Sequence, residues 1–405
     1  MKRMMSALLG LCFVGIVQAQ TLAVNQLFAF PCQSGLNDVC PDGARPTTLI
    51  QAADGNFYGV TQTSLDSHSF TQHPMGGTIF KLTASGKLTL LYTFQRNPTT
   101  GFYDQGSYPA ALTEGSDGFL YGAAGNGGPT AASAGTIFKI SKSGTGFQVL
   151  ETFCTTCVTG GFPNNLVAGT DGNMYGTTSA GGAFACQGLG CGVVFKLTPP
   201  GTYTVLHSFN GTTDTQVPLG VIQASDGNLY GTTSGTITGT IFRVNPSSGQ
   251  FTTIYTFPSG VHSVDVATQA SNRLLYGASR SSSNSGPVTV YSSTLGGTVQ
   301  NLVTISFGSA KKIGIGPFLQ ASDGNLWSTS SAGGTSSQGV VFAISFSGTI
   351  VQQLSLDGTK GAQPVAGVIQ TSNGTLYLAT TALGTDSSGN KAFGTVATIT
   401  GLPPR

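Results

Sequence analysis

The sequence predicts an all-β protein, a seven-bladed β-propeller of four-stranded antiparallel blades, and three observations lead to this prediction. A short phrase of the type Asp-Gly-Asn-Leu-Tyr-Gly recurs seven times along the 405 residues. A second phrase, of the type Gly-Thr-Ile-Phe-Lys-Leu, follows it in most repeats. No stretch shows a sustained apolar period of 3.6 residues, so we expect almost no helix. Four-stranded units of about 40–50 residues, repeated several times, are typical of propeller blades.

The first phrase marks the turn between the first two strands of each unit. It begins at Asp54, Asp117, Asp171, Asp226, Asn272, Asp323 and Asn373. Asp-Gly between runs of β-branched and aromatic residues is a strong hairpin signal, because glycine supplies the positive φ that the turn requires. We expect each Asp to hydrogen-bond the backbone of its own turn and not to act as a catalytic carboxylate. The fifth repeat departs most, with Arg273 at the glycine position.

The ends of the repeat array predict how the ring closes. In a complete unit, a Ser-Gly or Pro-Gly turn leads from the second phrase to a fourth strand of the type Leu-Leu-Tyr-Thr-Phe, as at residues 88–94. The last unit lacks this strand, whereas residues 22–30 resemble it. We therefore expect the N-terminal strand 22–30 to complete the last blade, which removes a free sheet edge. The alternative is an open β-solenoid, which needs polar caps that the sequence does not show.

The N-terminus has the layout of a secretory signal peptide. Two basic residues precede an apolar run over residues 7–17, which ends at a small-residue cleavage site. The run is shorter than the about 20 apolar residues that span a membrane. We expect residues 1–19 to be cleaved after Ala19, and residues 20–405 to form a single propeller domain without a membrane span. The protein is then secreted, to the periplasm or to the outside of the cell.

Six cysteines remain after the signal peptide and form three close pairs. The pairs are Cys32 with Cys40, Cys154 with Cys157, and Cys186 with Cys191. In an oxidising compartment this pattern indicates three local disulfides. A Cys-x-x-Cys redox motif needs its cysteine at a helix N-terminus, whereas a strand-like segment precedes Cys154. The irregular spacers also argue against a zinc site, so we expect no metal and no cofactor.

The two phrases together resemble the bacterial GloVer tandem-repeat family. The likeness covers nearly all of the expected mature chain, because both phrases recur in order. It implies an exported, propeller-like repeat architecture and no particular chemistry. Some members of the family look surface-anchored through a C-terminal sorting segment. Because residues 401–405 do not resemble one, we expect free secretion.

Alternation of strand direction predicts two unlike faces. The Asp-Gly and Ser-Gly turns share one face, and the long, variable connections share the other with all six cysteines. Function concentrates on variable loops held by a rigid scaffold, so we expect a ligand-binding face there. Phe102, Tyr103 and Tyr108 are candidates to stack on a sugar ring or a peptide, although packing within their own loop is the competing interpretation. His68 and His73 are further ligand-binding candidates, but two histidines near Asp66 make a poor metal site.

No catalytic constellation stands out in the chain. A formal net charge of +2 gives no reason to expect nucleic acid as a partner. Gly-x-Ser-x-Gly and phosphate-loop motifs are absent, and spacing leaves His207 and His262 isolated. We therefore expect a monomeric, non-catalytic scaffold that binds an extracellular glycan or protein. The alternative is a lyase or hydrolase, of the streptogramin-lyase type or acting on polysaccharides, because residues 323–327 look like the blade phrase of such secreted propellers.

Overall fold

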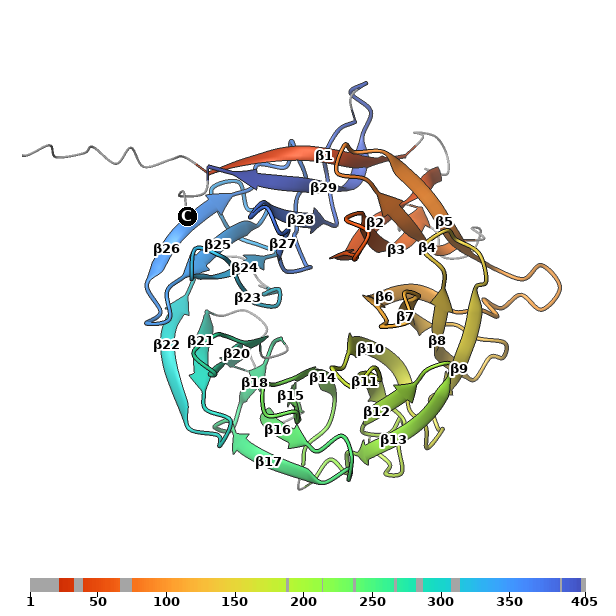
Figure 1. Ribbon diagram of the computed structural model, residues 1–405, viewed down its shortest axis with the longest axis vertical. Coiled ribbons are helices and arrows are strands. Elements are labelled where there is room, and N and C mark those ends of the chain that lie inside the picture. The colour runs from red at the N-terminus through yellow and green to blue at the C-terminus, as the bar shows by residue number, and fades with distance from the viewer. Residues whose placement is uncertain are drawn as a thin grey trace, which may run out of the picture.

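The computed structural model describes residues 22–32, 39–65, 75–186, 189–212, 214–235, 238–265, 268–281, 287–306, 314–386 and 388–401. These residues form seven antiparallel sheets and no helix, and therefore no helix that could cross a membrane. The sheets stand in a ring, with the first strand of each sheet nearest the centre and the fourth at the rim (Figure 1). The chain is a seven-bladed β-propeller, which confirms the predicted fold.

The blades are numbered from the first complete one. Blade 1 contains β2 (Val39–Gln51), β3 (Phe57–Leu65), β4 (Met75–Leu82) and β5 (Leu88–Gln95). Blade 2 contains β6 (Ser107–Glu114), β7 (Leu120–Asn126), β8 (Ser133–Ile140) and β9 (Gln148–Cys154). Blade 3 contains β10 (Gly161–Ala168), β11 (Met174–Ala180), β12 (Val193–Thr198) and β13 (Thr202–Ser208). Blade 4 contains β14 (Pro218–Gln223), β15 (Leu229–Thr233), β16 (Thr240–Val244) and β17 (Phe251–Thr256).

The last three blades have shorter inner strands. Blade 5 contains β18 (Val261–Ser263), β19 (Thr268–Gln269), β20 (Leu275–Ser281), β21 (Val288–Ser293) and β22 (Val299–Ile305). Blade 6 contains β23 (Leu319–Gln320), β24 (Leu326–Ser330), β25 (Val340–Ile344) and β26 (Ile350–Ser355). Blade 7 contains β27 (Ile369–Gln370), β28 (Leu376–Thr380), β29 (Ala392–Thr400) and β1 (Ala23–Pro31).

The N-terminal strand closes the ring as expected. Strand β1 pairs antiparallel with β29, from Ala23 opposite Thr400 to Pro31 opposite Ala392. The ring of Phe30 in β1 then lies edge-on to Phe80 of blade 1, with centroids 5.2 Å apart. The same contact joins blades that follow one another directly in the chain, because Phe94 of blade 1 lies 5.4 Å from Phe138 of blade 2. The apolar packing between blades therefore continues across the closure.

Each Asp-Gly turn anchors a buried aromatic side chain as well as its own backbone. In blade 3, Asp171 accepts hydrogen bonds from the backbone N–H of Asn173 at 3.1 Å and from the phenol of Tyr175 at 2.6 Å. Tyr175 is fully buried, so the carboxylate satisfies a polar atom that would otherwise be costly to bury. Equivalent pairs are Asp54–Tyr58, Asp117–Tyr121, Asp226–Tyr230 and Asp323–Trp327. The predicted turn role of these aspartates is confirmed, with a second role added.

Side-chain amides also join neighbouring blades on this face. The Gln223 carbonyl oxygen accepts the backbone N–H of Thr170 at 2.7 Å, and Gln269 accepts that of Ser225 at 2.7 Å. The same bond recurs further round the ring, from the N–H of Ser271 to Gln320 and from that of Ser322 to Gln370, and the carboxylate of Glu114 accepts the N–H of Ala53 in the same way. The polar groups of the face that carries the Asp-Gly turns are therefore largely engaged in holding the scaffold together.

Candidate functional site

The opposite face, which we call the variable-loop face, carries the connections between second and third strands and between blades. The structure forms all three expected disulfides there: Cys32–Cys40, Cys154–Cys157 and Cys186–Cys191. Strand β9 ends at Cys154 and a turn follows, so the helix that a redox motif needs is missing from this described segment. Three disulfides indicate a protein that resides in an oxidising, extracytoplasmic compartment.

A left-handed backbone position recurs where the innermost strands begin on this face. In five blades the residue before a proline has a φ between 53° and 60°; these residues are Arg45, Tyr108, Phe162, Val217 and Gln363. The proline that follows packs on a glycine of the preceding blade. At the ring closure, a Cβ added to Gly394 would lie 2.4 Å from Cδ of Pro46. Because the backbone repeats while the residue differs, this position offers a different side chain in each of the five blades.

Two of these residues, Arg45 and Gln363, line one hollow of about 450 Å³, which we call the Arg45 pocket. Blade 1 also contributes Thr47 and Gln62, and blade 7 contributes Val365 and Thr381. Blade 6 contributes Ser331, Ala332 and Ser337 from the loop after β24. Figure 1 shows blade 7 between blades 6 and 1, so the pocket lies where the two ends of the repeat array meet. Ring closure therefore builds a site that neither end contains alone.

Arg45 is the charged residue of this pocket, and the other described residues that line it are neutral. Arg45 is half-buried, and no described residue provides its guanidinium with a hydrogen bond or an ion pair. The hydroxyl of Thr381 donates to the backbone carbonyl of Gln363 at 2.9 Å and holds that side of the pocket in place. Hydroxyls, amides and one cation can bind a polar ligand, but they supply neither an acid–base pair nor an activated nucleophile.

The aromatic candidates lie elsewhere on the variable-loop face, between β5 and β6 and at the start of β6. Phe102 is 36% exposed, whereas Tyr103 and Tyr108 are half-buried. Burial raises the pKa of Tyr103, and nearby Tyr108 contributes to the same shift. The backbone carbonyl of Tyr103 accepts the N–H groups of Gly106 and Gly128, both at 2.8 Å. The three aromatics thus gather in one region outside the Arg45 pocket.

The structure describes some of the histidines considered in the sequence but not others. His68 and His73 lie outside the described residues, as does Asp66. The spacing leaves His207 isolated, but the structure brings its Nε2 to 2.7 Å from Oδ2 of Asp214. His207 also stacks on Phe251, with centroids 3.8 Å apart, and so fastens a connection between blades 3 and 4. No described hydroxyl or thiol hydrogen-bonds to this ring, and the described residues contain no cluster of three or more metal-ligating side chains.

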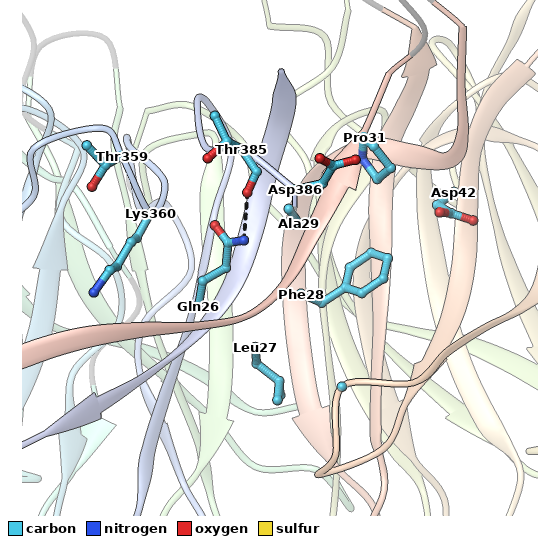
Figure 2. Close-up of a pocket in the computed structure, with 11 residues that line it drawn as sticks. Gln26, Leu27, Phe28, Ala29, Pro31, Asp42, Thr359, Lys360, Thr385 and Asp386 are labelled. Atoms are coloured by element: carbon cyan, nitrogen blue, oxygen red, sulfur yellow. Dashed lines mark hydrogen bonds between the residues drawn. The ribbon is translucent and has the colours of Figure 1, made fainter. Parts of the chain in front are cut away.

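A larger hollow of about 740 Å³ follows the outer strand β1 at the seam between blades 7 and 1. Figure 2 shows Phe28 between the two sides of this hollow, with the side-chain amide of Gln26 bonded to the backbone oxygen of Thr385 at 2.7 Å. The ammonium group of Lys360 donates to the carbonyl of Val24 at 2.7 Å. Burial raises the pKa of Asp42. Gln26 and Lys360 therefore help to hold β1 in the last blade.

Sequence and structure comparisons agree with this architecture. A family model described as the Gloeobacter/Verrucomicrobia repeat matches residues 45–272, more than half of the chain. No curated protein matches the chain in sequence.

Solved structures share the fold at low sequence identity. The extracellular domain of a hybrid two-component system from B. thetaiotaomicron has a TM-score of 0.56 at 11% identity, over 89% of this chain and 40% of that one. The present chain thus spans less than half the length of that structure. A protein from Bacteroides uniformis named for 6-phosphogluconolactonase activity has a TM-score of 0.53 at 16% identity, over 80% of this chain and 92% of that one. At these identities the likeness shows the fold alone.

Proposed function

The chain belongs to the Gloeobacter/Verrucomicrobia repeat family, and on that premise we propose that it is a secreted, non-catalytic binding protein that takes up an extracellular ligand on its variable-loop face. In this proposal residues 1–19 are removed on export and residues 20–405 act as one monomeric domain. The three disulfides support export, since such bonds persist in oxidising compartments.

The Arg45 pocket is the observation that carries the proposal. Its volume of about 450 Å³ falls within the range of about 300–1,000 Å³ that is usual for small-ligand sites. Its polar groups come from three blades and converge on one hollow. On the opposite face, by contrast, the turn aspartates and the glutamine amides already bond to the protein itself. Those turn aspartates and glutamines are therefore already engaged and offer a ligand little.

The composition of the pocket favours binding over turnover. General acid–base catalysis needs a titratable group close to the reacting atoms, usually a histidine or a carboxylate. The described residues that line the Arg45 pocket include neither. The loop aromatics Phe102, Tyr103 and Tyr108 extend the proposed binding face, because rings half-exposed on a rigid scaffold can stack on sugars.

A glycan array probed with the mature protein tests this proposal. We expect binding to a subset of glycans, with affinity lost in the pocket variant Gln363→Ala and retained in Gln300→Ala. Gln300 is a matched control, because it is an exposed glutamine on the rim strand β22. Bound glycans and lactones are then incubated with the protein, and products are followed by mass spectrometry. Release of product that Gln363→Ala abolishes would show an enzyme and overturn the non-catalytic reading.

A further inference from the structure

We infer that the Arg45 pocket binds an acidic saccharide, a sugar whose carboxylate or sulfate group pairs with the Arg45 guanidinium. This inference rests on the proposed binding function and specifies its ligand class. The shared chemistry is a planar or tetrahedral oxyanion attached to a polyhydroxylated body.

The first argument is the unpaired state of Arg45. Some other cations of the described chain are paired with a carboxylate, as when Lys142 pairs with Glu114 at 2.5 Å and Lys81 with Asp54 at 3.7 Å. Arg45 is half-buried with no such partner among the described residues. A partly desolvated charge is costly unless something pairs with it. The guanidinium presents its N–H groups as a fork that matches the oxygen atoms of a carboxylate or sulfate.

The second argument is that the backbone holds Arg45 in a fixed place. Arg45 has a φ of 60°, in the left-handed region that non-glycine residues rarely occupy. The next residue, Pro46, packs against Gly394 of blade 7, where even a methyl group would overlap it. Gln363 and Ser337, which line the same pocket, also have positive φ values, of 54° and 55°. Because the same φ recurs before proline in other blades, the scaffold sets the backbone position of Arg45 whether or not a ligand is bound.

The third argument is the chemistry of the remaining walls. Thr47 and Thr381 donate their hydroxyl protons to backbone carbonyls and keep oxygen lone pairs that can accept, whereas the amide of Gln62 and the hydroxyl of Ser331 can still donate. Sugar hydroxyls require such mixed partners. No carboxylate is present among the described lining residues, so the wall itself contributes no repulsion toward an anion. A neutral sugar would leave the Arg45 charge unpaired, whereas an acidic sugar satisfies both the charge and the polar walls.

The residues before the proline in the other blades show why the anion site lies at blades 1 and 7. The residue before the proline is Tyr108 in blade 2, Phe162 in blade 3 and Val217 in blade 4. None of these side chains carries a charge at neutral pH. The charged and amide versions, Arg45 and Gln363, occur in the two adjacent blades that the closure brings together. The position therefore specifies an anion at one place around the ring.

Isothermal titration with three short probes tests the inference: a trigalacturonate, a sulfated disaccharide and neutral maltotriose. We expect one or both acidic probes to bind and the neutral probe to bind at least tenfold more weakly. Arg45→Gln should lower the affinity for the acidic probe by roughly ten- to a hundredfold, the range expected for a hydrogen bond to a charged group. Arg45→Lys should recover part of that loss, because it restores the charge without the fork. The carboxylate and sulfate probes identify which oxyanion is preferred.

A matched control removes the same charge from the other face. Arg273→Gln alters an exposed arginine in the blade 5 turn and should leave the affinity unchanged. Thermal unfolding verifies that each variant is folded, and Arg45→Lys serves as the second test should Arg45→Gln unfold. Equal binding of maltotriose with no effect of Arg45→Gln overturns the acidic-ligand inference but leaves the binding function intact. Failure of both acidic probes to bind the wild-type protein overturns the inference, while the glycan array decides the binding function independently.

Discussion

Replacing Phe30 with alanine tests whether the N-terminal strand is a full member of the last blade. Phe30 lies in β1 and is fully buried. Its ring is 5.2 Å from that of Phe80, at an interplanar angle of 63°. Phe94 is a matched control, since it is also fully buried and lies 5.4 Å from Phe138 at 63°. The main difference is that blades 7 and 1 meet through the N-terminal strand, whereas blades 1 and 2 follow one another in the chain. Phe94 also has one further ring neighbour in blade 2, Phe147, at 5.8 Å.

The expected magnitude follows from burial. Truncation of a buried phenylalanine to alanine costs about 3–5 kcal/mol, because apolar surface is lost and a cavity remains. Both rings are completely shielded from solvent. We therefore expect Phe30→Ala and Phe94→Ala each to lower the free energy of unfolding by about 3–5 kcal/mol, and the two losses to agree within about 1 kcal/mol.

Urea unfolding followed by tryptophan fluorescence measures both variants. The chain has a single tryptophan, Trp327, which is fully buried in blade 6 next to the closing blade. The contrary outcome is that Phe30→Ala lowers the free energy of unfolding by less than about 1 kcal/mol while Phe94→Ala lowers it by about 3–5 kcal/mol. Such a small loss is typical of an exposed residue, and it would refute the conclusion that β1 packs as a buried strand of the last blade. Small losses in both variants would refute the larger argument that apolar contacts between blades stabilise the ring.

Two further predictions concern blade 5, which departs most from the repeat. Arg273 has a φ of 64° where the other blades place glycine. Arg273→Gly should raise the free energy of unfolding by about 0.5–1 kcal/mol, because it removes the cost of a left-handed arginine and adds the smaller entropic cost of glycine. A lower melting temperature of the variant in calorimetry would contradict this. Burial raises the pKa of Asp265 well above its usual value, so the stability present below about pH 4 declines as pH rises toward the folded-state pKa. Asp265→Asn keeps an oxygen that can accept the N–H of Ala278, which lies at 3.1 Å in the structure. In urea unfolding the variant should be more stable than wild type at about pH 7, and its free energy of unfolding should change less with pH above about pH 4. An unchanged dependence on pH would show that Asp265 is not the group responsible.

Local repetition explains why the fold was predictable. Each Asp-Gly turn and each second phrase specifies one hairpin, and seven copies determine the blade number. The Asp–Tyr pair was missed although its signal is in the sequence, because the two residues recur four apart, as in Asp171 and Tyr175. The short inner strands β23 and β27 were not foreseen, since the runs before those turns are apolar like the others. The start of such a strand depends on backbone hydrogen bonds to the adjacent strand, which the residue composition does not reveal.

The candidate site was much less predictable. Sequence reasoning places function on the variable-loop face, and it selects aromatic residues and histidines because those residue types often bind ligands. Arg45 and Gln363 give no comparable signal, since they are ordinary residues before a proline. A pre-proline residue is expected in the extended region, yet both are left-handed. Each of the two prolines contacts a glycine of the preceding blade, a tertiary contact that the local sequence does not show, and the contact of Pro46 with Gly394 forms only when the ring closes.

The closed ring explains why the sequence predicts the scaffold but not the Arg45 pocket. Residues that repeat with the blade, such as the turn aspartates and the packing phenylalanines, are needed in most blades and determine the scaffold. A residue that changes from blade to blade at one fixed backbone position is free of that requirement, because the scaffold tolerates arginine, tyrosine, phenylalanine, valine and glutamine there. In a repeat protein, ligand specificity is therefore best sought where the backbone repeats and the side chain does not. Arg45 fits this description, and it lies at the junction where the two ends of the repeat array meet.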